Sequence, residues 1–143
     1  MNLLTNIIIG FLILEAINVA TLYFAPGSKL ANGVGVFKAW EESKQYPDIH
    51  NFIKYLVNWV AGAKLIFIFL LIVVLYFGDH NTLIYAAVAL FASILSFFWR
   101  LFPLIRQMDQ NAQIEPKNYS IGLAGMILGF VIVFFTAVHV AVL

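Results

Sequence analysis

Residues 65–77 form an apolar run, LIFIFLLIVVLYF, with no polar group before Tyr76. With the preceding turns from Phe52, the segment exceeds the ~20 apolar residues that a helix needs to cross a bilayer. Lys64 lies 12 residues after Phe52, which places it roughly 18 Å into the helix at a rise of about 1.5 Å per residue. An ammonium at that depth costs at least a few kcal/mol if nothing meets it. We therefore expect another segment to supply a partner for Lys64.

The composition identifies lipid as the solvent of this chain. Of its 143 residues, 63% are hydrophobic and only 10% are charged, whereas soluble domains contain about 25% charged residues. A globule of this size cannot bury so much apolar surface. The chain has no cysteine, which excludes disulfides, iron–sulfur clusters, thiolate zinc sites and cysteine nucleophiles. We expect no cofactor, because no transmembrane segment offers the paired histidines of a b-type haem.

Four apolar segments predict an all-α membrane protein, an antiparallel four-helix transmembrane bundle forming a single domain over residues 1–143. The expected helices cover roughly residues 2–24, 52–78, 82–105 and 119–142. In the first connection, Val36, Phe37 and Trp40 share one face of a short amphipathic helix. This helix either lies in the membrane interface or packs on the bundle. Residues 106–117 are expected to form a polar loop.

Small and polar residues recur at helical spacing in the last two segments. Gly122, Gly125 and Gly129 include a G-x-x-x-G pair that favours close helix packing, with a neighbour in this chain or in another. The third segment carries a stripe that we expect to face other helices rather than lipid. Its members are Tyr85, Ala89, Ser93, Ser96 and Arg100.

The basic residues predict the orientation. Apart from Lys64, every Lys and Arg lies near the first or the third connection: Lys29, Lys38, Lys44, Lys54, Arg100, Arg106 and Lys117. Cytoplasmic loops hold the positive excess of membrane proteins. We therefore expect a multi-pass protein of the plasma (inner) membrane with both long connections cytoplasmic and both termini outside.

Glu15 is the expected partner of Lys64. It lies nine residues before Phe24, roughly 14 Å from the cytoplasmic end of its helix, so the two estimated depths differ by only ~4 Å. Asn18 and Asn58 are expected as additional donors and acceptors nearer the cytoplasm. An intramembrane ionisable group indicates an ion or ligand pathway, and Arg100 is a further candidate for it. The alternative is a pair that only fixes helix register.

Other reactive groups give weaker signals. Asp79, His80 and His139 lie at the outer end and match metal ligands in type, but their spacing specifies no site, and we expect solvated interfacial side chains and no metal. The sequence contains no H-E-x-x-H, nucleophile elbow or P-loop. It is therefore more typical of a protein that is not an enzyme.

Gly10 followed by Glu15, in the first helix of a small four-helix chain, resembles the opening of the small multidrug-resistance transporters. In that family an intramembrane Glu exchanges protons for cationic drugs, so the resemblance implies transport. It covers only about the first 25 residues. This chain departs from the family by its long charged first connection and by Lys64, a cation opposite the supposed cation site, and we do not assign it to the family.

Three classes of function remain open at this point. The first is transport or conduction of an ion or small solute at the Glu15–Lys64 site. The second is an accessory or structural subunit of a larger membrane complex, and the third is a membrane enzyme acting on a lipid or quinone. The expected partners are the lipid bilayer and either a second copy or a membrane complex, with no nucleic acid.

Overall fold

The computed structural model describes residues 3–143 and confirms the all-helical bundle. Four segments are long and apolar enough to cross a membrane. The elements in chain order are α1 (Leu3–Phe24), the 3₁₀ helix η1 (Val34–Val36), α2 (Lys38–Ser43), α3 (Pro47–Phe77), α4 (His80–Leu95), α5 (Phe97–Gln110) and α6 (Tyr119–Val142).

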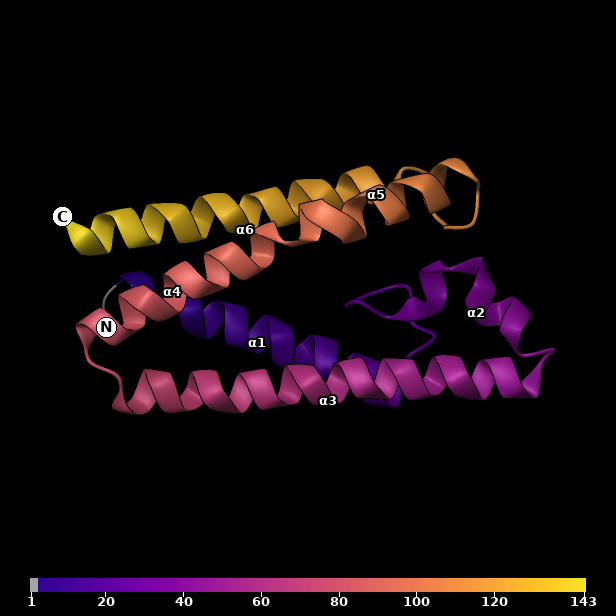
Figure 1. The fold of residues 1–143 in the computed structure, drawn as a ribbon, viewed down its shortest axis with the longest axis horizontal. Coiled ribbons are helices and arrows are strands. Elements are labelled where there is room, and N and C mark those ends of the chain that lie inside the picture. The colour runs from indigo at the N-terminus through magenta and orange to yellow at the C-terminus, as the bar shows by residue number, and fades with distance from the viewer. Residues whose placement is uncertain (1–2) are drawn as a thin grey trace.

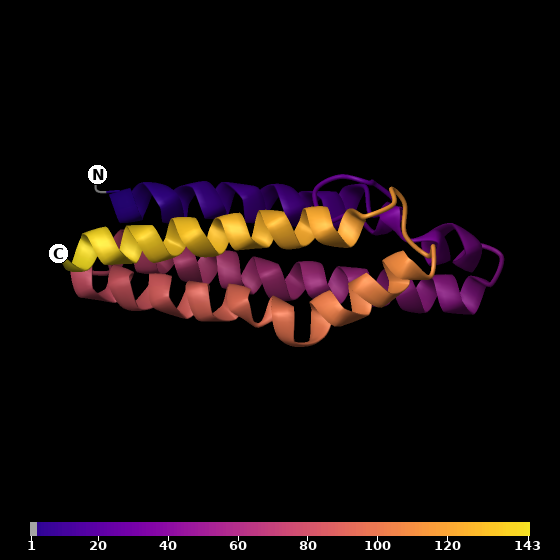
Figure 2. The ribbon, with the colours of Figure 1, turned by 90° about the horizontal axis from the view of Figure 1, so that it is seen from above.

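The spans run alternately in opposite directions along one axis (Figure 1). The start of α1, the end of α6 and the α3–α4 turn lie at one end of the bundle, which we call the terminal end. The connections before α3 and before α6 lie at the other, which we call the connection end (Figures 1 and 2). The end-to-end asymmetry of basic residues predicted from the sequence is therefore a property of the fold.

Two helix boundaries differ from those expected. α3 begins at Pro47 rather than Phe52, because proline is well tolerated in the first turn of a helix, where its missing N–H removes no intrahelical bond. Its 31 residues span roughly 46 Å, more than the ~30 Å of a bilayer core. The third span continues to Gln110, so residues 106–110 are helical rather than loop.

The third span is broken between α4 and α5 at Ser96, where its direction changes (Figure 2). Ser93 Oγ donates to the Ala89 carbonyl at 2.8 Å, and Ser96 Oγ donates to the Ser93 carbonyl at 2.6 Å. Serine hydroxyls that bond back to helical carbonyls bend helices. Pro103, inside α5, also lacks the N–H that would continue the helical ladder.

The stripe expected to face other helices does so only in part: Ser93, Ser96 and Arg100 line a cavity between helices, whereas Tyr85 and Ala89 do not. Tyr85 is 74% exposed, and Ala89, Ser93, Ser96 and Arg100 are also exposed. The buried face of α4 consists instead of Leu83, Ala87 and Leu90. The buried face contains only apolar side chains, whose removal from solvent is favourable and carries no cost for an unpaired polar group.

The first connection folds against the third at the connection end. Phe37 and Ile114 form an isolated antiparallel bridge, and a small cluster of Val36, Ile105 and Ile114 is buried beneath it. α2 packs on the start of α3, where the rings of Trp40 and His50 lie 4.8 Å apart. Of the two positions considered for this short helix, the structure therefore has it packed on the bundle.

A carboxylate from α5 begins α6. Asp109, which is buried, accepts hydrogen bonds from the Asn118 amide at 3.1 Å, the Ser120 amide at 3.0 Å and the Ser120 hydroxyl at 2.6 Å. Asn118 precedes α6 with a φ of 66° and gives no side-chain cap of its own. Asp109 thus performs the role of an N-cap from another helix.

Replacing this carboxylate tests the assignment. Asp109→Ala leaves the Ser120 hydroxyl and two helix-start amides without their acceptor, so the melting temperature in detergent should fall clearly. Gln110→Ala, at the neighbouring exposed position, is the control and should leave it nearly unchanged. Equal melting temperatures for both variants would contradict the role given to Asp109.

Candidate functional site

Glu15 and Lys64 interrupt two otherwise apolar rows of buried residues. On α1 the row is Leu4, Ile8, Leu12, Val19 and Leu22; on α3 it is Val57, Ala61, Ile68 and Leu71. The members follow one another at intervals of three and four residues, the spacing of helices that pack side by side. Glu15 fills the gap between Leu12 and Val19, and Lys64 fills the gap between Ala61 and Ile68.

The ion pair expected from the sequence is present. Lys64 Nζ donates a hydrogen bond to Glu15 Oε2, and the two side chains are 28% and 14% exposed respectively. The second carboxylate oxygen, Oε1, accepts a long hydrogen bond of 3.5 Å from Asn18 Nδ2. Each charge is therefore met between the first two spans, as a bilayer interior requires.

Asn58 does not join this cluster. It is exposed and makes no side-chain hydrogen bond within residues 3–143. It follows Val57 directly, so it is turned by about 100° from the buried row of α3 that carries Lys64. Asn58 was expected near Glu15 from its depth along the helix alone. Its direction around the helix axis places it on another face of α3.

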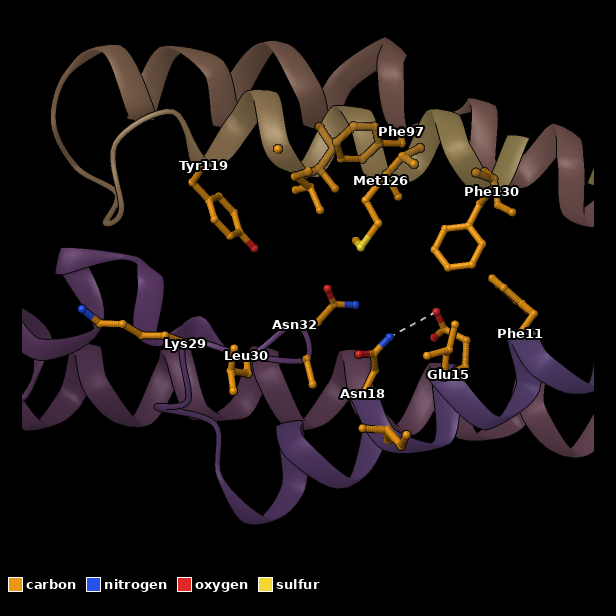
Figure 3. A pocket seen from close by; sticks show the side chains of 18 of the residues that line it. Phe11, Glu15, Asn18, Lys29, Leu30, Asn32, Phe97, Tyr119, Met126 and Phe130 are labelled. Atoms are coloured by element: carbon orange, nitrogen blue, oxygen red, sulfur yellow. Dashed lines mark hydrogen bonds between the residues drawn. The ribbon is translucent and has the colours of Figure 1, made fainter. Parts of the chain in front are cut away.

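A cavity of about 860 Å³ lies beside the pair, and we call it the Glu15 cavity. It is lined by α1, by residues 29–32 of the first connection, by the α4–α5 junction, and by residues 116–118 with the first half of α6. Figure 3 shows Glu15 and Asn18 on one side of the space, across from Phe97, Met126 and Phe130. The volume falls within the range of sites for single small molecules, roughly 300–1,000 Å³.

Aromatic side chains separate the cavity from the terminal end. The ring of Phe11 lies 6.2 Å from that of Phe67, 6.0 Å from that of Phe130 and 5.4 Å from that of Phe134, each in an edge-to-face arrangement. Phe134 is fully buried. Edge-to-face pairs of this kind are favourable beyond the surface they bury, so the cavity has a firm apolar floor.

Arg100 lines the same cavity without joining the ion pair. It is exposed and forms no salt bridge within the described chain. The pathway role assigned to Glu15, Asn18, Lys64 and Arg100 stays a prediction. The structure brings the first three into contact and places the fourth on the wall of the cavity.

The two histidines at the terminal end, His80 and His139, contact different partners and not each other. His80 Nε2 lies 3.2 Å from the Ala141 carbonyl, and the His139 ring stacks on Phe135. Asp79 caps α4, where hydrogen bonds from the Thr82 hydroxyl and amide lower the pKa of its carboxyl. Within residues 3–143 no group of three potential ligands that could hold a metal is present.

The glycines of α6 lie against open space. A methyl group built at Gly122, Gly125 or Gly129 meets no atom within 4 Å. Gly122 lines the Glu15 cavity, whereas Gly125 and Gly129 are not among the residues described as lining it. No part of the described chain therefore packs closely against this glycine face.

Sequence analysis did not predict the cavity or its floor. The cavity depends on the bend at Ser96 and on the placement of residues 29–32. Neither feature can be predicted from the hydropathy of the sequence. Phe11 and Phe130 appear in the sequence as ordinary apolar residues of membrane helices. The sequence signals on the cavity wall are Glu15, Asn18 and Arg100, the residues expected to form an ion or ligand pathway.

Exchanging the paired residues tests the energetic role of the ion pair. Lys64→Met leaves Glu15 without its cation and should lower the free energy of unfolding by roughly 3 kcal/mol. The double variant Glu15→Gln/Lys64→Met removes both charges and should recover most of that loss. Denaturation in mixed micelles measures both, with the exposed Glu41–Lys44 pair, neutralised in the same way, as control. Strictly additive losses in the double variant would show that the charges do not stabilise each other.

Comparison with models of protein families, with curated proteins and with solved structures finds no match to this chain. Its four apolar helices fit a small multi-pass integral membrane protein. Any finer assignment depends on the ion pair and on the cavity beside it.

Proposed function

We propose that this protein transports an ion or small solute through the Glu15 cavity, and that the Glu15–Lys64 pair changes partners in each cycle. The observation that supports this proposal is the position of the pair: Glu15 is bonded to Lys64 and also lines a cavity of about 860 Å³. A structural pair needs no such access. A proton that reaches Glu15 competes directly with Lys64 for the carboxylate.

Loss of this partner has a consequence for the bundle. Lys64 stands in the buried row of α3, so an unpaired ammonium there disfavours the α1–α3 packing. Protonation of Glu15 thus favours a different arrangement of α1 against α3, and a two-state bundle of this kind is what alternating access requires. In the proposed cycle, the cavity opens toward the cytoplasm in one state, with both termini outside the plasma membrane.

A flux measurement tests the proposal, with protons as the first ion because the Glu15 carboxyl can carry one. Purified protein in liposomes should dissipate an imposed pH gradient, followed by a trapped pH-sensitive dye, faster than protein-free liposomes. Glu15→Gln and Lys64→Met should each reduce the rate to that of protein-free liposomes. Glu41→Gln, at an exposed ion pair away from the cavity, should retain the wild-type rate.

Two results would count against transport. One is a wild-type rate no higher than that of protein-free liposomes. The other is an unchanged rate in Glu15→Gln and Lys64→Met variants whose helical content matches the wild type. A bound lipid or quinone that is chemically altered on incubation would instead support the membrane enzyme considered from the sequence.

The open glycine face favours a second candidate, an accessory subunit that binds a partner helix. Gly125 and Gly129 have no neighbour within 4 Å in the described chain, and small residues at this spacing promote helix association in membranes. The partner in this proposal is a second copy or a subunit of a larger membrane complex.

Bulky substitutions on this face test the second candidate. Gly125→Leu and Gly129→Leu should reduce chemical cross-linking in native membranes several-fold, because the side chains hold the backbones apart. Gly10→Leu, at an equally open glycine of α1, is the control and should cross-link like the wild type. Isolation of the wild type only as a free monomer, without cross-links, would exclude this candidate.

A further inference from the structure

The charges that line the Glu15 cavity do not cancel. Four charged residues contribute to its wall: Glu15, Lys29, Arg100 and Lys117. Lys64 balances Glu15, and Lys29 lies 3.4 Å from a carboxylate oxygen of Glu115. Arg100 and Lys117 have no acidic partner within residues 3–143. The uncompensated charge of the cavity is therefore positive and comes from these two residues.

The rest of the wall is largely apolar and extends deep into the membrane span. Its larger side chains are Phe11, Phe97, Leu123, Met126, Ile127 and Phe130. Phe130 lies 11 residues after Tyr119, roughly 16 Å along α6 from the connection end. Lys117 lies just before α6, at that same end. The cavity thus combines a basic residue at its shallow end with an apolar depth.

From this arrangement we infer that the Glu15 cavity binds a single-chain amphiphile with an anionic headgroup, a carboxylate or a phosphate. The headgroup meets Lys117 at the connection end and the guanidinium of Arg100, whose long side chain extends toward it from a position roughly 15 Å from the end of α5. The chain lies between α1 and α6 toward Phe11 and Phe130. Guanidinium and ammonium groups bind such oxyanions through charge-assisted hydrogen bonds. This inference names the class of ligand that the proposed transport site binds. That the ligand is moved across the membrane rests on the proposed function, whereas its binding is measured separately.

The competing ligand class is a cationic amphiphile received by Glu15. Lys64 already donates to one oxygen of that carboxylate and Asn18 to the other. A cation would have to displace Lys64 and then pass two unpaired basic groups. Charge complementarity therefore favours the anion.

Spin-labelled stearic acid is a suitable probe, because a nitroxide near the end of its chain reports immobilisation. The wild-type protein in nanodiscs of zwitterionic lipid is titrated at alkaline pH with the acid, with its methyl ester and with a trimethylammonium analogue of equal chain length. The acid should bind about tenfold more tightly than either analogue, the effect of one charge-assisted contact. Equal immobilisation of all three, or tighter binding of the cation, would overturn the inference.

Variants locate the two parts of the ligand. Arg100→Gln/Lys117→Gln should weaken binding of the acid about tenfold or more and abolish its advantage over the ester. Lys54→Gln, an exposed basic residue of the connection end outside the cavity wall, should bind like the wild type. Retained selectivity in the double variant would show that another group holds the headgroup.

Filling the cavity tests the position of the chain. Gly122 lines the cavity, and a Cβ built on it meets no atom within 4 Å, so the position has room for a substitution that fills part of the space, Gly122→Leu. It should reduce binding of the acid several-fold, while Gly10→Leu, at an equally open glycine outside the cavity wall, should not. Unchanged binding in a folded Gly122→Leu variant would overturn the inference.

A competition experiment distinguishes a site for an amphiphile from a site for a small free anion. Excess inorganic phosphate should displace little of the bound acid, because it lacks the apolar chain. Full displacement would indicate a simple anion site and contradict the inference. If the acid binds as expected while no flux is found in liposomes, the ligand class stands and the transport proposal fails.

Discussion

The opposition of one carboxylate and one ammonium inside the bilayer governs the packing of this bundle. Glu15 and Lys64 occupy positions in two rows that otherwise hold only apolar side chains. Every other contact in those rows tolerates a small slide of one helix along the other, since dispersion is not directional. The ion pair does not, because either charge left in hydrocarbon is costly. It therefore fixes the register of α1 against α3, and the other spans pack around that register.

The helices pack more tightly near the terminal end than toward the connection end, and the looser packing leaves room for the Glu15 cavity. Near the terminal end, Leu4, Ile8, Phe134 and Ala137 are buried almost completely. Toward the connection end, the bend at Ser96 and the inserted residues 29–32 surround a space between α1 and α6. The Glu15–Lys64 ion pair lies at the boundary between the closely packed part of the bundle and the part that contains the cavity. A group with this placement is held by the packed part while remaining accessible from the open part.

The sequence predicted those features that depend on composition, depth and charge. Four spans, the basic connection end and the Glu15–Lys64 contact all follow from such one-dimensional quantities. Asn58 was misplaced because depth along a helix does not give the direction of a side chain around it. The break at Ser96 was missed because hydropathy continues through it, and Asp109 was assigned to a loop because its partners, Asn118 and Ser120, become neighbours only after folding.

The location of Phe11 links the ion pair to the barrier that closes the cavity. Phe11 and Glu15 are four residues apart on α1, so they lie on neighbouring turns of the same helix face. Phe11 contacts Phe67, Phe130 and Phe134 and so joins α1 to both α3 and α6. A rotation of α1 that separates Glu15 from Lys64 must also move Phe11 within this aromatic floor. In the proposed transport cycle, a change of partner at the carboxylate is therefore coupled to a movement of Phe11 through one rigid helix.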